Sequence, residues 1–247
     1  AVGGAATAVV IVVGVINTTG VGFRMGFMVT NGAAELASYI QPLLGWIPSD
    51  AFSLQSIQLF LSLCFVAMAC ILMGAGLPTT ALYIMLVSVA QPALAQLGVP
   101  PLASHMFVLY YGVMSEITPP VCASVYAAAA LAGANFWRVA GRALMLAGAI
   151  YVVPFLFVFR PGILAQGGTG QILMDMGVAS AAVFAVSVGT SGWFRGKVPV
   201  IGRLLFLSAA ALLFYAAPAA DIIGGLALAG LLAWRFLHGA PQPGRAG

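Results

Sequence analysis

Long apolar stretches follow one another along the chain, separated by short segments rich in Gly, Pro and polar residues. These stretches cover approximately residues 5–18, 22–40, 59–73, 81–97, 102–115, 121–134, 144–159, 177–193, 204–219 and 222–237. Apolar runs of this kind predict helices that are solvated by lipid or by each other. We therefore expect an all-α, polytopic membrane protein.

Two short motifs interrupt this pattern inside apolar runs. GAGLPTT occupies residues 74–80, and EITPP occupies residues 116–120. Gly and Pro break helices, and a broken helix inside a membrane is tolerated where its free backbone groups line a polar or water-filled site. Paired breaks of this kind indicate the binding site of a secondary transporter.

The lengths of the neighbouring segments predict how the breaks are arranged. A polar turn at residues 53–58 leaves about 15 apolar residues before the first break, or roughly 22 Å of helix, which is short for a full crossing. We expect a re-entrant hairpin over about residues 53–97. Residues 102–134 would form a helix of roughly 50 Å, too long for one span, so we expect a discontinuous helix divided by EITPP.

The first break offers ligands for ions of both signs. Pro78 crowds the carbonyl of Gly74, while Gly74 and Gly76 allow backbone geometries closed to other residues, so carbonyl oxygens are released toward the tip. Thr79 or Thr80 can cap the helix that starts near residue 81, and the partial positive charge of that helix end favours a carboxylate. The alternative is an ordinary loop between two spans with Thr as a routine cap.

The second break places polar groups near the expected membrane midplane. Pro119 and Pro120 free the carbonyls of about Ser115 and Glu116, and Thr118 is pushed out of helical geometry by the proline after it. Such oxygens suit sodium. An intramembrane carboxylate is a functional candidate, so Glu116 could coordinate an ion or carry a proton. It could also steady the broken helix or face a water-filled vestibule with a structural partner.

Composition and charge agree with a membrane carrier and exclude a nucleic-acid-binding protein. The 247 residues are 62% apolar and 6% charged, and no run of three basic residues occurs. With the hairpin open to the outside and the broken helix crossing inward, eight of the nine basic residues lie inside, as the positive-inside rule expects. These are Arg24, Arg138, Arg142, Arg195, Lys197, Arg203, Arg235 and Arg245. Arg160, Asp50, Asp175 and Asp221 then lie outside.

The remaining notable residues receive structural interpretations. Cys64, Cys70 and Cys122 lie in apolar runs, where we expect small buried hydrophobic side chains rather than disulfides. No second ligand at metal-binding spacing accompanies His105, which predicts a hydrogen-bonded structural histidine. Tryptophans beside cations predict anchors at the membrane interface, namely Trp137 with Arg138 and Arg142, and Trp193 with Arg195 and Lys197.

Three segments carry a family resemblance: GAGLPTTALYIML, then GVPPLASHMFVLYYGVMSEITPPVCASVYAAAALAGAN, then YVVPFLFVFRPGIL. Together they resemble the large permease subunit of tripartite ATP-independent periplasmic (TRAP) transporters. The likeness is greatest to fused permeases of the branch served by TAXI-type receptors. It covers residues 5–162 well and the last helices more loosely. In that family two inverted repeats each contain a re-entrant hairpin and a discontinuous helix, and sodium drives the uptake of organic anions.

The resemblance implies an organisation and a set of partners. Residues 1–162 are expected to form the second repeat, with C-terminal transmembrane helices over residues 163–247. The chain begins with Ala1 inside an apolar run, so we expect a piece of a longer polypeptide whose N-terminal half lies upstream. The implied partners are that half, a small membrane subunit or its fused equivalent, a periplasmic receptor and the lipid bilayer of a bacterial inner membrane.

The resulting hypothesis is a permease for sodium-driven uptake of carboxylates, with sodium as the coupling ion, no cofactor and no enzymatic activity. The expected sodium ligands lie at Gly74, Gly76, Pro78, Thr79, Ser115, Glu116, Thr118 and Pro119. The expected substrate contacts are Leu77, Thr79, Thr80 and Thr118. Two alternatives are kept. One is an ion-channel subunit, although no filter-like run occurs. The other is an intramembrane enzyme using His105 with Ser104, Ser115 or Ser124, although no nucleophile motif surrounds them.

Overall fold

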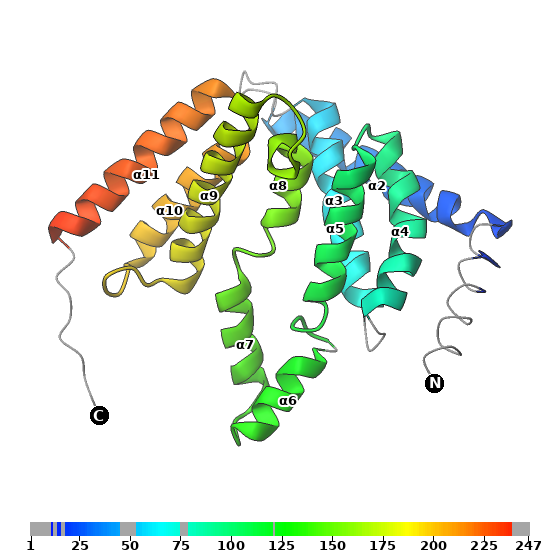
Figure 1. Ribbon diagram of the computed structural model, residues 1–247, viewed down its shortest axis with the longest axis horizontal. Coiled ribbons are helices and arrows are strands. Elements are labelled where there is room, and N and C mark those ends of the chain that lie inside the picture. The colour runs from blue at the N-terminus through cyan, green and yellow to red at the C-terminus, as the bar shows by residue number, and fades with distance from the viewer. Residues whose placement is uncertain are drawn as a thin grey trace. The chain divides into compact units, whose positions relative to one another are not determined.

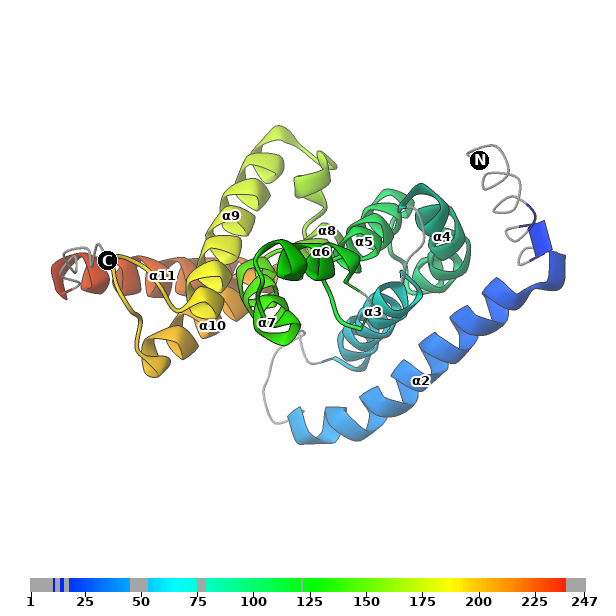
Figure 2. The ribbon, with the colours of Figure 1, turned by 90° about the horizontal axis from the view of Figure 1, so that it is seen from below.

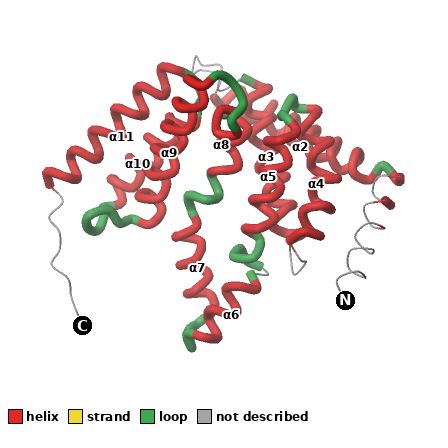
Figure 3. The backbone as a smooth tube through the Cα atoms, viewed as in Figure 1, coloured by secondary structure: helices red, strands yellow, loops and turns green. Residues whose placement is uncertain are grey.

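The structure is a computed structural model that describes residues 11, 14, 15, 18–44, 53–74, 79–120 and 122–238. These residues form helices joined by loops, and an isolated bridge between Trp193 and Lys197 is the only β-type pairing among them (Figures 1 and 3). The helices are α2 (Val21–Leu44), α3 (Leu54–Met73), α4 (Thr79–Gln96), α5 (Pro101–Met114), α6 (Ala123–Leu131), α7 (Phe136–Ala147), α8 (Val153–Phe159), the 3-10 helix η2 (Pro161–Leu164), α9 (Thr169–Ser191), α10 (Val200–Phe214) and α11 (Pro218–His238). The all-α prediction is confirmed.

Three helices of the described chain are long and apolar enough to cross a membrane: α3, α9 and α11. The apolar helix α10 is shorter, at 15 residues. Many large apolar side chains on these helices are exposed, including Met68 on α3, Leu173 on α9 and Leu226 on α11. Such surfaces are costly in water and favourable in lipid, as expected for a membrane protein.

The chain divides into two compact units, residues 1–140 and 141–247. In the first unit α2 lies along α3 and α4, and α5 packs against the same two helices (Figure 2). The approach of α2 to α4 is close, because a Cβ added at Gly26 would lie 3.1 Å from the Cβ of Ala93. Phe107 and Leu63 are completely buried in this unit. The boundary predicted after residue 162 concerns family repeats and stays a prediction.

Helix α3 begins earlier than the sequence suggested. Ser53 is its N-cap, and the Ser53 hydroxyl accepts a hydrogen bond from the Ser56 amide at 3.2 Å. Gln58 lies inside the helix and donates to the carbonyl of Thr30 on α2 at 3.3 Å. The predicted polar turn at 53–58 is therefore wrong. The 20-residue helix is about 30 Å long, so its length no longer favours a re-entrant hairpin, which stays a prediction.

The second unit is built around three helices that run back and forth. Helix α10 packs against both α9 and α11, and α9 also contacts η2. The core between them is rich in alanine, including Ala182, Ala185 and Ala209. A Cβ added at Gly189 would lie 2.6 Å from Cγ of Leu207, so α9 and α10 need glycine there. Small residues that let helix backbones approach closely are typical of membrane helix packing.

Candidate functional site at the two helix breaks

The first break begins at Gly74, the C-cap of α3. Its φ of −67° and ψ of 0° are ordinary right-handed values, and its amide donates to the Cys70 carbonyl at 2.9 Å. The prediction that Gly74 adopts a geometry closed to other residues is therefore wrong. Glycine is needed for space, because an added Cβ would overlap with Oγ and Cβ of Ser115.

Ser115 joins the two breaks. It is the C-cap of α5 and is 2% exposed. Its hydroxyl lies 2.6 Å from the Gly112 carbonyl oxygen and 3.2 Å from the Gly74 carbonyl oxygen. The single hydroxyl hydrogen is donated to one carbonyl at a time, which leaves lone pairs on all three oxygens. Clustered hydroxyl and carbonyl oxygens are the ligands that hard cations prefer.

The second break is a tight turn after α5. The amide of Thr118 donates to the Ser115 carbonyl at 3.3 Å, and the Thr118 hydroxyl donates to the Met114 carbonyl at 2.6 Å. The Ser115 carbonyl therefore has a backbone partner, which corrects the prediction that proline leaves it free. Glu116 and Pro119 are half-buried in this turn. Helix α6 begins after it at Ala123, so the predicted break within residues 102–134 is present.

The other predicted site residues are brought together only in part. Gly76, Leu77 and Pro78 lie outside the described residues. Thr79 and Thr80 are exposed in the first turn of α4, which begins at Thr79 rather than near residue 81. The prediction that one of them caps the helix from the preceding position is therefore wrong. Both still lie at the N-terminus of α4, where helix geometry favours an anion.

A tyrosine and histidine pair links α4 and α5 beyond the breaks. The hydroxyl of Tyr83 and Nδ1 of His105 are 2.7 Å apart, and both side chains are partly buried. His105 therefore has the hydrogen-bond partner that its structural interpretation expected. Sequence reasoning missed Tyr83, because no local pattern pairs residues on two different helices.

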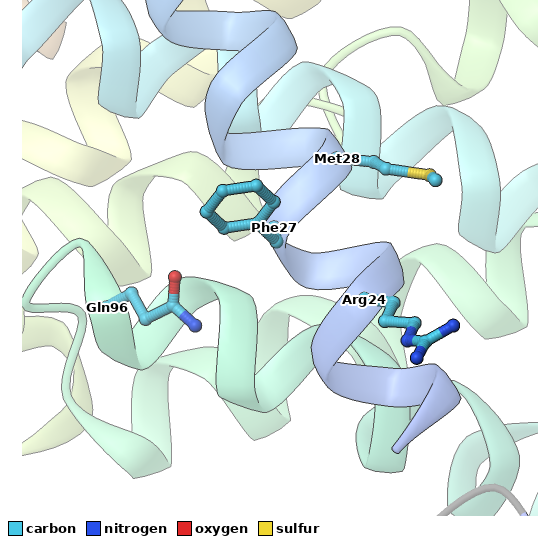
Figure 4. Close-up of a pocket in the computed structure, with 4 residues that line it drawn as sticks. All are labelled: Arg24, Phe27, Met28 and Gln96. Atoms are coloured by element: carbon cyan, nitrogen blue, oxygen red, sulfur yellow. The ribbon is translucent and has the colours of Figure 1, made fainter. Parts of the chain in front are cut away.

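A cavity of about 360 Å³ lies at the opposite end of α4 from the breaks. Arg24, Phe27 and Met28 of α2 and Gln96 of α4 line it (Figure 4). Gln96 ends the 18-residue α4, which places it about 25 Å along the helix from Thr79. The cavity is therefore separate from the site at the breaks.

The second unit contains a buried ion-pair cluster. Arg160, 2% exposed, donates through Nη1 to Asp175 at 3.3 Å and through both terminal nitrogens to Asp221. Its Nη2 also donates to the carbonyls of Leu213 at 2.9 Å and Tyr215 at 3.2 Å. Sequence reasoning placed these three charged residues on one side but missed that they form a cluster. The available signal was a lone Arg among apolar residues with acids at the ends of later helices.

Comparisons with known proteins identify a family for this chain. The sequence model of a family described as "Tripartite ATP-independent periplasmic transporter, DctM component" matches residues 1–172. This range covers well over half of the chain and contains both helix breaks and Arg160. No curated protein and no solved structure matches the chain.

Proposed function

The chain belongs to the DctM component family of tripartite ATP-independent periplasmic transporters, and we propose that it mediates sodium-driven uptake of organic anions, specifically carboxylates. The observation that carries this proposal is the hydrogen bond between Ser115 and the Gly74 carbonyl, which joins two helix ends at their breaks. Unwound backbone at paired breaks coordinates the driving ion in many secondary transporters.

The proposed sodium site lies around this junction. Its buried oxygens are the carbonyls of Gly74 and Gly112 and the hydroxyl of Ser115. Further ligands are proposed from the two sequence motifs: Gly76, Pro78, Thr79, Glu116, Thr118 and Pro119. Glu116 would supply a negative charge near the ion, which lowers the cost of holding a cation away from water.

The proposed carboxylate site lies beside the sodium site, at the N-terminus of α4. Exposed amides at a helix N-terminus favour an anion, and a bound cation nearby strengthens that preference. The residues proposed to contact substrate are Leu77, Thr79, Thr80 and Thr118. If the sodium ion and the carboxylate bind next to each other, each raises the affinity of the other. This reciprocal effect is the basis of coupled transport.

The proposed assembly has several components in a bacterial inner membrane. Substrate would be delivered by a periplasmic receptor, and a small membrane subunit or a fused equivalent would complete the permease. We further propose that residues 1–162 are the second of two inverted repeats, in a fused permease of the TAXI-served branch. The resemblance of GAGLPTTALYIML and the EITPP segment to that branch supports this assignment.

Two threonine variants test the proposed sodium site. In proteoliposomes containing the complete transporter and its receptor, Thr79→Ala or Thr118→Ala should raise the sodium concentration for half-maximal uptake several-fold, because each removes a proposed ligand. Uptake would be measured with a panel of radiolabelled mono- and dicarboxylates. Ser208→Ala, which removes an exposed hydroxyl on α10, is the matched control and should leave sodium dependence unchanged. Unchanged sodium dependence in both threonine variants would remove these hydroxyls from the site.

The same assay separates the carrier from a channel. A carrier gives uptake that saturates with substrate and stops without sodium, whereas a channel passes ions without such coupling. The matched family is a transporter family, so it gives no support to the alternative hypothesis that the chain is an intramembrane enzyme.

A further inference from the structure

The loop between α9 and α10, residues 192–198, is a tight reversal with its own hydrogen bonds. The Phe194 amide donates to the Gly196 carbonyl at 3.0 Å, and the Val198 amide donates to the Gly192 carbonyl at 2.8 Å. Trp193 and Lys197 face each other across the reversal as an isolated antiparallel bridge. The loop therefore has a defined shape, and we call residues 192–198 the basic tip.

Arg235 and an aromatic cluster hold the basic tip in place, and Arg203 binds the end of α9 next to it. Arg235 of α11, 8% exposed, donates to the carbonyls of Phe194 at 2.7 Å, Gly196 at 3.2 Å and Lys197 at 3.4 Å. Arg203 donates to two carbonyls at the end of α9, at 2.8 Å and 2.9 Å. The ring of Phe194 packs edge-on against Phe184 and Phe236. Arg235 therefore binds the backbone of the basic tip, and Arg203 binds the backbone at the end of α9 next to it.

The outward side chains of the basic tip are different. Trp193, Arg195 and Lys197 alternate along the loop and are all exposed, whereas Phe194 is half-buried and Val198 buried. The guanidinium carbon of Arg195 lies 4.5 Å from the centre of the Phe236 ring. Both salt bridges found among the described residues belong to Arg160, so neither Arg195 nor Lys197 has a carboxylate partner there.

Arg195 occupies an unusual backbone conformation. Its φ is +50°, in the left-handed region that glycine and asparagine adopt more easily than arginine. A residue held there costs roughly 1–3 kcal/mol, and strain of this kind is concentrated at ligand sites. A residue other than glycine is therefore kept at position 195 in spite of this cost.

We propose that the basic tip binds the phosphate of an anionic phospholipid, with Arg195 and Lys197 as the two cationic ligands. Trp193 lies beside them, and tryptophan prefers the headgroup level of a bilayer. Val200 and Ile201 at the start of α10 are 70% and 73% exposed and offer an apolar surface to an acyl chain. Adjoining cations and exposed apolar side chains match a charged headgroup on a hydrocarbon tail better than they match a small anion in water.

Trp193 provides a probe for this proposal. In the full chain, replacement of Trp46, Trp137 and Trp234 by Phe leaves Trp193 as its tryptophan reporter. The protein would be placed in phosphatidylcholine nanodiscs containing increasing fractions of brominated phosphatidylglycerol or brominated phosphatidylcholine, whose bromines quench tryptophan on contact. We expect the anionic lipid to bind more tightly by on the order of 30-fold, because each cation near the headgroup contributes about 1 kcal/mol. We also expect 0.5 M salt to weaken that preference.

Two double variants separate a site from general surface charge. Arg195→Asn with Lys197→Gln should abolish the preference while keeping the fold, since asparagine tolerates a positive φ. Arg24→Gln with Arg142→Gln removes two positive charges from exposed positions outside the basic tip. This variant should keep the preference for the anionic lipid. Circular dichroism and thermal unfolding check that both variants are folded.

Three outcomes would overturn the proposal. Equal quenching by the two brominated lipids would show that the basic tip has no headgroup preference. Loss of the preference in both double variants would assign it to net charge. Displacement of the brominated phosphatidylglycerol by millimolar glycerol 3-phosphate would assign the site to a soluble phosphate.

Discussion

Gly74 and Ser115 show how a single contact can join two helix breaks. The backbone at Gly74 is ordinary, so its lack of a side chain matters only because Ser115 occupies the adjacent space. Ser115 can then reach the Gly74 carbonyl from the end of another helix. A buried hydroxyl between two carbonyls fixes the distance between the breaks and leaves oxygen lone pairs available there.

The first prediction concerns this contact. Gly74→Ala should lower the unfolding temperature and the sodium-dependent uptake, because its Cβ overlaps with Ser115 and overpacking costs roughly 1–3 kcal/mol. Combining it with Ser115→Gly should restore much of the unfolding temperature by making room for the new methyl group. Thermal unfolding in detergent compares the single and double variants. An equal fall in the unfolding temperature of the single and the double variant would mean that Gly74 is needed for a reason other than space.

At the scale of elements, Arg160 connects four segments of the second unit. It follows α8 and contacts Asp175 on α9, the carbonyls at the end of α10, and Asp221 in the first turn of α11. The Gly162 amide completes the cluster by donating to Asp175 at 3.0 Å. The cluster therefore fastens together the ends of these segments.

A second prediction follows from its burial. Arg160→Met leaves two buried carboxylates without their cation, and breaking a buried ion pair costs roughly 3–5 kcal/mol. We expect a large fall in the unfolding temperature and in the yield of folded protein. Arg142→Met, at an exposed position, should change neither. An Arg160→Met protein as stable as the wild type would show that the cluster contributes no net stability.

The sequence predicted features that depend on local chemistry and missed features that depend on distant contacts. Both helix breaks were predicted, because Gly and Pro act on the backbone next to them. The start of α3 was misplaced, because a serine followed by polar residues reads equally as a turn and as a capped first turn. In the cluster around Arg160, the partners Asp175 and Asp221 lie 15 and 61 positions away along the chain. The sequence shows an isolated Arg and two acids, but not that these distant residues pair.

At the scale of the whole molecule, the second unit separates its charges by helix end. The basic tip, Arg203 and Arg235 gather where α9 ends, α10 begins and α11 ends. Arg160 and its two carboxylates gather at the opposite ends of the same helices. Uncompensated cations at one end predict that this end faces the cytoplasm.

A third prediction tests this orientation on one helix. The 23-residue α9 is about 35 Å long, enough to cross the hydrocarbon core, and its end residues Thr169 and Ser191 are exposed. With the native cysteines replaced by Ala, a membrane-impermeant maleimide should label Thr169→Cys from outside intact cells. It should label Ser191→Cys only after the membrane is opened. Labelling of both from outside would contradict the topology.

Binding of radioactive sodium to the purified permease tests the central claim most directly, because it needs no knowledge of the substrate. A scintillation proximity assay with ²²Na⁺ should give a saturable isotherm that unlabelled sodium displaces and potassium does not. Ser115→Ala should weaken binding about tenfold or more, since it removes the hydroxyl between the Gly74 and Gly112 carbonyls, while Ser208→Ala should match the wild type. Absence of saturable sodium binding, or an unchanged isotherm in Ser115→Ala, would contradict a coupling-ion site at the two helix breaks.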